Sequence, residues 1–374
     1  MTRPDILVVG GGIVGQVTAI TLAQEGAGVT IVDAAQNAGS TANAGSLHVQ
    51  MQSRFMRLYP DQVPNIEASL PLYRAAAAEW ATLDQTHGPF DLVRKGGLML
   101  AETADQLAFL EQKAEREARQ GLDVEIMNRT ALNRIAPWLS PNIIGAELCR
   151  DEGKLNPLAA NTRLRSAAKA LGVQFATDHI AEIETTETGI TAHGANSTYK
   201  ADRVVIAAAW GAGRLAAGLG VTIPTAAEPL HMNITEPCAT EINHLVQHAE
   251  RSITLKQFHT GQIVIGGGWP ARDRGERTPP EVLAPSLLGN VALAARLVPA
   301  IGATRVIRTW AGINTTTDGA SIIGHLPGAE RVVMAIPGDA GYTLGPLVAR
   351  MAAGCVLGTD PPHDPAPFCP RRFA

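Results

Sequence analysis

The chain reads Ile6-Leu7-Val8-Val9-Gly10-Gly11-Gly12-Ile13-Val14-Gly15 near its start, and this stretch decides the fold. Four consecutive apolar residues are typical of a strand that is buried on both faces in a parallel sheet. Gly10 permits a tight turn, Gly12 lets the backbone approach a pyrophosphate, and Gly15 lets the following helix pack closely on the strand. Amides at the start of that helix would face phosphate groups.

A second predicted strand strengthens this interpretation. The run Val29-Thr30-Ile31-Val32 ends in Asp33, which lies 18 residues beyond Gly15. This is close to the spacing at which an acidic residue bonds a ribose hydroxyl. Gly26 ends the helix between the two strands. An ordinary strand-to-helix turn does not require all these features in this order, so the sequence predicts a dinucleotide site.

The composition is that of a globular protein with room for two domains. The chain has 374 residues, of which 45% are hydrophobic and 18% charged, and its net charge is -4. No basic block exceeds Arg371-Arg372, which argues against nucleic acid as a partner. The first strand begins too early to leave room for a signal peptide, and no apolar run reaches membrane-spanning length. We therefore expect a soluble cytoplasmic protein without a membrane span.

The sequence gives no support for a metal site. The four cysteines are far apart and form no Cys-x-x-Cys pair, which argues against zinc and iron-sulfur centres. His244 and His248 stand four residues apart, as two metal ligands on one helix would, but no third ligand is evident. We interpret them as part of a solvated helix face.

Several further elements follow from periodicity and from turn residues. We expect helices at 69–83, 104–120 and 158–171, and a hairpin at 92–101 that turns at Gly96-Gly97. Charges of alternating sign run through 104–120, which is typical of a surface helix without a chemical role.

Later segments indicate two sheets. The strand at 204–208 follows a helix and would return to the first sheet. Short alternating segments lie at 230–234, 253–256, 263–266 and 305–310. Such segments joined by turns predict an antiparallel sheet, where a substrate domain would lie.

A last strand at 332–336 leads into the glycine-rich stretch 337–346. We expect Pro346 to be the first residue of a helix over 347–356. The N-terminus of that helix, beside glycine-rich backbone, would stabilise negative charge.

Two arginines follow a run of small and polar residues at 39–48. Arg54 and Arg57 are three residues apart and share one face if this segment is helical. They could hold a carboxylate, or they could be solvated or pair with Asp61 and Glu67. Spacing alone favours the solvated alternative.

Taken in order, these motifs resemble the D-amino acid oxidase type of FAD-dependent oxidoreductase. That family includes glycine oxidase, sarcosine oxidase and the flavin subunits of opine and hydroxyproline dehydrogenases. The similar segments are the glycine triplet with Asp33, then 40–47, 204–210, 310–324 and 338–346. The resemblance runs from end to end of the chain.

The resemblance implies a mixed fold of α/β and antiparallel β structure. A Rossmann-like, glutathione-reductase-type FAD domain would comprise 1–85, 150–220 and 325–374. An antiparallel substrate domain would comprise 86–149 and 221–324. Ala311 stands where monomeric sarcosine oxidase has its flavin-linked cysteine, so we expect non-covalent FAD. The resemblance implies FAD contacts from Gly10, Gly12, Ile13, Val14, Gly15, Asp33, Ser40, Thr41, Asn43, Ala44, Gly45, Ser46, Leu47, Ile180, Ala207, Ala208, Trp210, Gly312, Gly338, Asp339, Ala340, Gly341, Tyr342 and Thr343.

The substrate side departs from the family pattern. Between Gly312 and Asp318, where glycine oxidase-like proteins carry an arginine for the substrate carboxylate, this chain has Ile313 and Asn314. The strand end at 207–210 also lacks the family's usual glycine.

Other residues can therefore be considered as ligands and catalytic groups. His48, Arg54 and Arg57 resemble a His and an Arg-x-x-Arg near the flavin of monomeric sarcosine oxidase. Lys256 is a weaker candidate for the substrate carboxylate, with a solvent-facing position as its alternative. His231, like His48, could take a proton from the substrate amine, or it could be structural.

We thus expect FAD-dependent oxidation of the C-N bond of a small or N-substituted amino acid, such as an opine, a proline or a sarcosine-like compound. Hydride transfer to flavin would give an imine that hydrolyses to a 2-oxo acid. The chain would act as the flavin subunit of a hetero-oligomeric dehydrogenase and pass electrons to a second flavin or an iron-sulfur subunit. The alternatives are a self-sufficient oxidase that produces hydrogen peroxide and a non-catalytic FAD-binding subunit.

Overall fold

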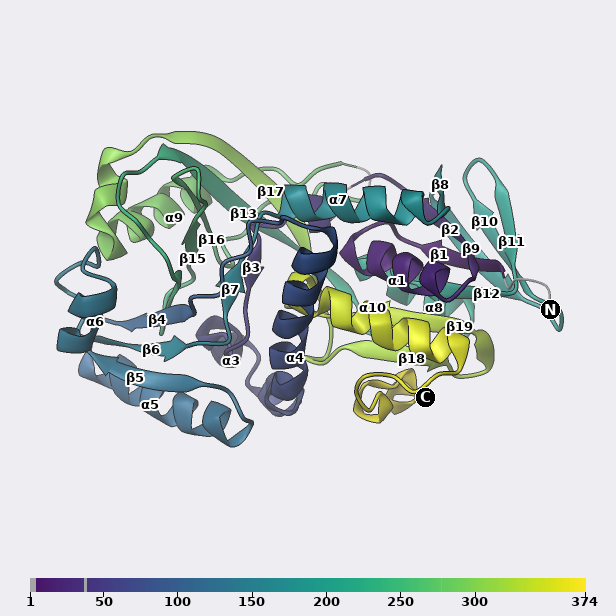
Figure 1. Cartoon of the computed structure of the whole chain (residues 1–374), viewed down its shortest axis with the longest axis horizontal. Helices are drawn as coiled ribbons and strands as arrows, with labels where there is room; N and C mark the ends of the chain where they lie inside the picture. Colours follow the sequence, from purple (N-terminus) through teal and green to yellow (C-terminus); the bar gives the residue numbers. More distant parts are fainter. Residues whose placement is uncertain (1–4, 37–38, 277) are drawn as a thin grey trace.

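Two large sheets organise the computed structural model, which describes residues 5–36, 39–276 and 278–374 (Figure 1). The first is six-stranded, and its strands are parallel except for an antiparallel pair at one edge, β18 and β19. Val8 at its centre lies opposite Ile31 and Val205, and all three side chains are buried. In spatial order its strands are β18 (Ile322–Leu326), β19 (Ala329–Ile336), β12 (Arg203–Ile206), β1 (Asp5–Val9), β2 (Gly28–Asp33) and β8 (Gln174–Thr177).

Both faces of this sheet are covered, which accounts for the apolar runs in its central strands. Helices α1, α4, α7 and α10 share one buried core with one face, and α8 lies in the core of the other face with a three-stranded sheet. The helices are α1 (Ile13–Gln24), α4 (Val63–His87), α7 (Pro157–Ala170), α8 (Ala212–Gly218) and α10 (Gly341–Leu357). The small sheet consists of β9 (Ile180–Thr185), β10 (Ile190–Gly194) and β11 (Thr198–Ala201).

The second large sheet has eight strands and is antiparallel except between β14 and β4. Helices α6 (Arg129–Ile135) and α9 (Ala284–Leu297) pack on one face, and α5 (Ala104–Arg119) packs on the other. In spatial order its strands are β17 (Val306–Thr316), β13 (Ala226–Pro237), β16 (Gln262–Gly266), β15 (Thr254–Gln257), β14 (Leu245–His248), β4 (Gly97–Ala101), β6 (Gly145–Cys149) and β5 (Val124–Asn128).

The predicted fold class, a Rossmann-like sheet combined with antiparallel sheets, is confirmed. A two-stranded sheet is formed by β3 (Ser46–Leu47) and β7 (Gly153–Lys154), and β3 lies in sequence between the short helices α2 (Gly39–Ala42) and α3 (Ser53–Leu58). The domain boundaries expected from the sequence stay a prediction. Among the described residues, no helix is long and apolar enough to cross a membrane. The cytoplasmic location stays a prediction too.

The prediction for the start of the last helix was wrong. Helix α10 begins at Gly341, so Pro346 lies inside it rather than at its first position. A proline inside a helix leaves the carbonyl four residues earlier without its usual N-H partner. Here that carbonyl belongs to Tyr342, and the buried Trp80 Nε1 donates to it at 3.0 Å. The tryptophan of α4 thereby makes the internal proline tolerable.

The predicted hairpin at 92–101 was also wrong. Only β4 forms a strand there, and it pairs with β6 and β14 instead of folding back on 92–96. Val93 forms an isolated bridge with Lys154. The buried carboxylate of Glu152 occupies the space beside Gly97, where a Cβ would lie 1.8 Å from its Oε2. Long-range packing therefore decides this segment.

Two predicted solvent-facing groups are buried. His244 and His248 lie at strand β14 rather than on a helix, and burial lowers the pKa of each imidazole to about 4. The predicted surface helix α5 exists, but its inner face carries the fully buried Lys113 and Glu117. Lys113 Nζ lies 2.8 Å from carboxylate oxygens of both Glu117 and Glu147. An alternating charge pattern could not show that two of these charges face inward.

Candidate active site

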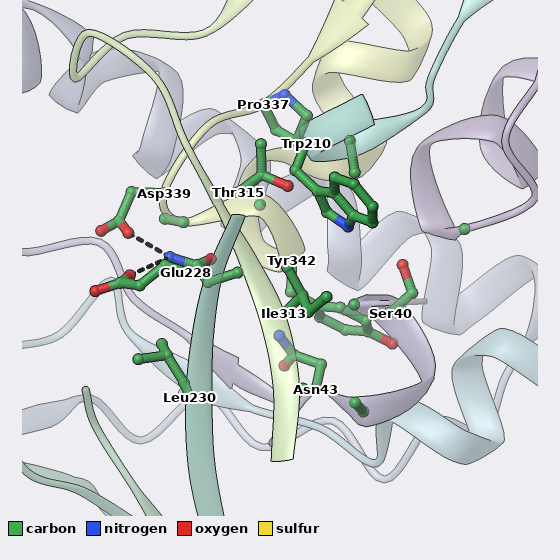
Figure 2. A pocket seen from close by; sticks show the side chains of 18 of the residues that line it. Ser40, Asn43, Trp210, Glu228, Leu230, Ile313, Thr315, Pro337, Asp339 and Tyr342 are labelled. Carbon is green, nitrogen blue, oxygen red and sulfur yellow. Dashed lines mark hydrogen bonds between the residues drawn. The ribbon is translucent and has the colours of Figure 1, made fainter. Parts of the chain in front are cut away.

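A cavity of about 390 Å³ is lined by residues of both large sheets. The carboxyl ends of β1, β2 and β12 reach it from the first sheet, and β13 and β17 reach it from the second. Ligands of open α/β sheets bind outside the carboxyl ends of the strands, so its position fits a ligand site. Figure 2 shows Leu230 on β13, Ile313 on β17, Trp210 and Tyr342 among the side chains that line the cavity.

The glycine turn after β1 requires glycine at two points. Gly10 has φ +109°, and a Cβ there would lie 2.3 Å from the Ala207 carbonyl oxygen. A Cβ on Gly15 would lie 1.9 Å from the Gly10 carbonyl oxygen. Helix α1 then begins after Gly12, which has no side chain to cap it, and Gly12, Ile13 and Val14 line the cavity. The turn fits a pyrophosphate.

Polar side chains hold this turn in shape. Asp33 Oδ2 accepts a hydrogen bond from Gly11 N at 2.6 Å, and its Oδ1 accepts one from Ala35 N at 2.8 Å. Ser40 Oγ accepts from Ile13 N at 2.9 Å. Asp33 thus sits at the end of β2 where a ribose-binding acid belongs.

The loop between β19 and α10 approaches the same cavity. Tyr342 stacks on the buried Trp80 with ring centroids 5.1 Å apart and an interplanar angle of 14°. Gly338 has φ +83°, and residues 337–343 all line the cavity. Together the two glycine-rich segments present backbone to a long ligand at two places, which fits FAD.

Most residues proposed for FAD line this cavity, whereas Gly15, Thr41, Gly45 and Leu47 do not. Gly15 acts through the packing of α1, as described above. The residues that line it are Gly10, Gly12, Ile13, Val14, Asp33, Ser40, Asn43, Ala44, Ser46, Ile180, Ala207, Ala208, Trp210, Gly312, Gly338, Asp339, Ala340, Gly341, Tyr342 and Thr343.

Of the five residues proposed for the substrate side, His48, Arg54 and His231 line the cavity. His48 Nδ1 lies 3.4 Å from Gln52 Nε2 and 3.8 Å from Glu152 Oε1. His231 is fully buried, and burial lowers the pKa of its imidazole, which favours the neutral ring. A neutral ring can accept a proton.

Arg57 and Lys256 do not line the cavity. Arg57 donates to the Ala249 carbonyl and lies over the Phe109 ring at 4.7 Å. Lys256 is fully buried rather than solvent-facing, and its Nζ donates to Ser46 Oγ at 2.6 Å. Burial lowers the pKa of this ammonium to about 7. Lys256 therefore reaches the cavity only through a cavity-lining serine.

Sequence reasoning missed an acidic group beside Arg54. Glu228 on β13 pairs with Arg54, whose Nη2 lies 2.8 Å from Glu228 Oε1. Asn314 on β17 donates to Glu228 Oε2 at 3.1 Å and to Asp339 Oδ1 at 2.6 Å (Figure 2). Glu228 stands opposite Asn314 in the β13–β17 register. No local motif marks Glu228, so only that register could have identified it.

Glu152, which sequence reasoning also missed, holds the segment that carries His48. It is fully buried, and its carboxylate accepts from the amides of Val49 and Gln50 and from the side chains of Gln50 and Gln247. The distances are 2.9, 3.3, 2.8 and 2.8 Å, respectively. This carboxylate fixes the chain between β3 and α3.

The fold and the cavity define a dinucleotide-binding protein with an antiparallel substrate sheet. The family model described as "FAD dependent oxidoreductase" (DAO) matches residues 5–354. The chain therefore belongs to the DAO family of FAD-dependent oxidoreductases. The predicted resemblance, the enzymatic class and the FAD cofactor are thereby confirmed, whereas non-covalent attachment stays a prediction.

Curated relatives and solved structures cover the whole chain. An opine oxidase subunit from Agrobacterium tumefaciens (strain Ach5) is 25% identical, with 100% of this chain and 98% of that protein aligned. Glycine oxidase from Bacillus licheniformis is 26% identical, with 95% and 94% aligned. The crystal structure of glycine oxidase from Geobacillus kaustophilus superposes with a TM-score of 0.86 over 100% of both chains at 22% identity, which shows a common fold.

Proposed function

We propose that this protein oxidises the C-N bond of a small or N-substituted amino acid. One observation carries the proposal: Arg54, a cation suited to a carboxylate, lines the same cavity as the dinucleotide-binding turn. The relatives named opine oxidase, glycine oxidase and sarcosine oxidase support this substrate class. The product would be an imine that hydrolyses to a 2-oxo acid.

FAD, when bound, supplies the hydride acceptor. The glycine turn before α1, Asp33 and the segment 337–343, which leads into α10, would hold it. Arg54 would bind and orient the substrate carboxylate so that the Cα-H faces the acceptor. His48 and His231 are the proposed proton acceptors for the substrate amine. Arg57 and Lys256 stay predictions for the substrate side, and their positions outside the cavity lining make an indirect role the simpler one.

We further propose that the protein works as the flavin subunit of a hetero-oligomeric dehydrogenase. Two relatives, from an opine oxidase and a sarcosine oxidase, are named as single subunits of those enzymes. The free cysteines at 149, 238, 355 and 369 form no cluster motif, so electrons would leave to a companion flavin or iron-sulfur subunit.

The test is anaerobic absorbance of the FAD-loaded protein during addition of glycine, sarcosine, proline, hydroxyproline and opines. Bleaching of the flavin band by one compound is the expected result. Admission of air then separates the alternatives, because a self-sufficient oxidase regains colour quickly and forms peroxide, whereas a dehydrogenase regains it slowly. No bleaching by any of these compounds, even with co-purified subunits, would contradict the proposed substrate class and favour the non-catalytic alternative.

A further inference from the structure

The substrate side of the cavity presents a charge pair rather than a single cation. Arg54 and Glu228 both line the cavity, and their side chains are 26% and 20% exposed. Neither group is sealed inside the protein, so a ligand in the cavity can reach both. Arg54 therefore already has a carboxylate partner, and a substrate carboxylate must displace Glu228 or share Arg54 with it.

Glu228 lies beside the loop proposed to hold the flavin. Its Oε2 and the Oδ1 of Asp339 share the side-chain amide of Asn314 as their donor (Figure 2). Asp339 belongs to the loop between β19 and α10. Asn314 therefore ties β17 to this loop and holds Glu228 at a fixed position between the loop and Arg54.

The other arginines of the cavity are engaged elsewhere. Among the described residues that line it, the remaining arginines are Arg214 and Arg251, and no lysine lines it. Arg214 donates to the carbonyls of Ala181 and Ile180, while Arg251 lies 3.5 Å from Glu102.

A ligand that brings only a carboxylate to Arg54 would compete with Glu228 and leave the Glu228 carboxylate without its cation, with the Asn314 amide as its remaining partner. Leaving a partly buried charge unpaired is costly. A ligand that brings a carboxylate and a protonated nitrogen satisfies both members of the pair.

We propose that Glu228 binds the protonated nitrogen of the substrate while Arg54 binds its carboxylate. The inference rests on the proposed function and deepens it, because it defines the substrate as a zwitterion. Amino acids and N-substituted amino acids fit this pair, and simple carboxylates and 2-hydroxy acids do not.

Two compounds that cannot be oxidised test the inference without turnover. 2-Aminoisobutyrate and pivalate both lack a Cα-H, and they differ only in an ammonium in place of a methyl group. Their dissociation constants for the FAD-loaded protein are measured from flavin difference spectra and by calorimetry. We expect 2-aminoisobutyrate to bind more tightly by about tenfold or more, as a charged hydrogen bond would provide.

Two variants separate the roles. Glu228→Gln keeps the shape of the side chain and should abolish the preference by weakening 2-aminoisobutyrate alone. Arg54→Met should weaken both compounds. Glu281→Gln, which removes an exposed carboxylate outside the cavity, is the control and should change neither. FAD content and melting temperature establish that each variant is folded, and Glu228→Asp should retain part of the preference.

Equal binding of the two compounds to the wild-type protein, or no binding of 2-aminoisobutyrate, overturns the inference. A Glu228→Gln variant that keeps the preference does so as well. These outcomes are independent of flavin bleaching, which tests the proposed function itself. Bleaching by an amino acid together with an unchanged preference in Glu228→Gln would uphold the function and reject the role of Glu228.

Discussion

Lys256 is a fully buried lysine whose ammonium contacts a serine hydroxyl and no carboxylate within hydrogen-bonding distance among the described residues. Burial, together with the charge of Lys154, lowers the pKa of its ammonium from 10.5 to about 7 in the folded protein. Burial likewise lowers the pKa of Lys154 to about 8. Both lysines are therefore more readily deprotonated in the folded chain than in the unfolded one.

Between pH 7 and 10.5 the unfolded chain binds more protons, so the free energy of unfolding rises with pH across this window. We expect Lys256→Met to flatten this rise, because the substitution removes the group that titrates. The change should be a few kcal/mol, at about 1.4 kcal/mol per pKa unit. Urea unfolding of both proteins at pH 7, 8 and 9 measures it, and an unchanged slope would contradict the predicted cause.

Gly15 provides a second test of the effect of a single residue. A Cβ there would lie 1.9 Å from the Gly10 carbonyl oxygen, so Gly15→Ala must open the turn that faces the phosphates. We expect a loss of stability of about 2–4 kcal/mol and weaker FAD binding. Gly218→Ala is the matched control, because a Cβ meets nothing within 4 Å there and the residue lies in α8. Calorimetric melting measures the stability of both variants, and FAD titration measures their affinity for FAD. Equal effects of both substitutions would contradict the predicted role of Gly15.

Among the contacts between secondary-structure elements, those of Glu152 join the segment between β3 and α3 to strand β14. Its carboxylate accepts hydrogen bonds from Val49, Gln50 and Gln247, and its side chain is fully buried. Glu152→Ala would leave these donors buried and unpaired, so we expect a loss of about 3–5 kcal/mol. Proteolysis should also reach residues 48–52 sooner. Glu241→Ala, at an exposed position, is the control and should change neither observable.

The separation along the chain between interacting residues explains which predictions from sequence succeeded. The unit β1–α1–β2 was predictable because its strand, glycines and acid lie within one short segment and act on each other directly. The start of α10 was not, because Trp80 satisfies the carbonyl that Pro346 leaves without a partner. The role of Glu228 in the cavity was not predictable either, because it depends on the β13–β17 register that places Glu228 opposite Asn314. Local chemistry could be read from the sequence, whereas partners distant along the chain could not.

In the molecule as a whole, residues of both large sheets line the cavity, so a bound dinucleotide should stabilise the two sheets together. FAD at about 100 times its dissociation constant should raise the free energy of unfolding by roughly 2.7 kcal/mol. FMN lacks the second phosphate and the adenosine, so the turn at Gly12 and Asp33 would have less to hold. We expect a smaller shift in melting temperature with FMN at equal concentration, and equal shifts would contradict the proposed role of the turn.

The order of strands in the six-stranded sheet also bears on how the protein is made. Strand β1 pairs with β12, and β12 pairs with β19, which begins at residue 329. A ribosome must therefore complete almost the entire polypeptide before this sheet can close. Until then the apolar strand β12 remains on the nascent chain with only β1 as its neighbour in the sheet. Pairing over such separations is slow, and exposed strands attract other chains. Expression at low temperature, or with more chaperone, should raise the soluble yield.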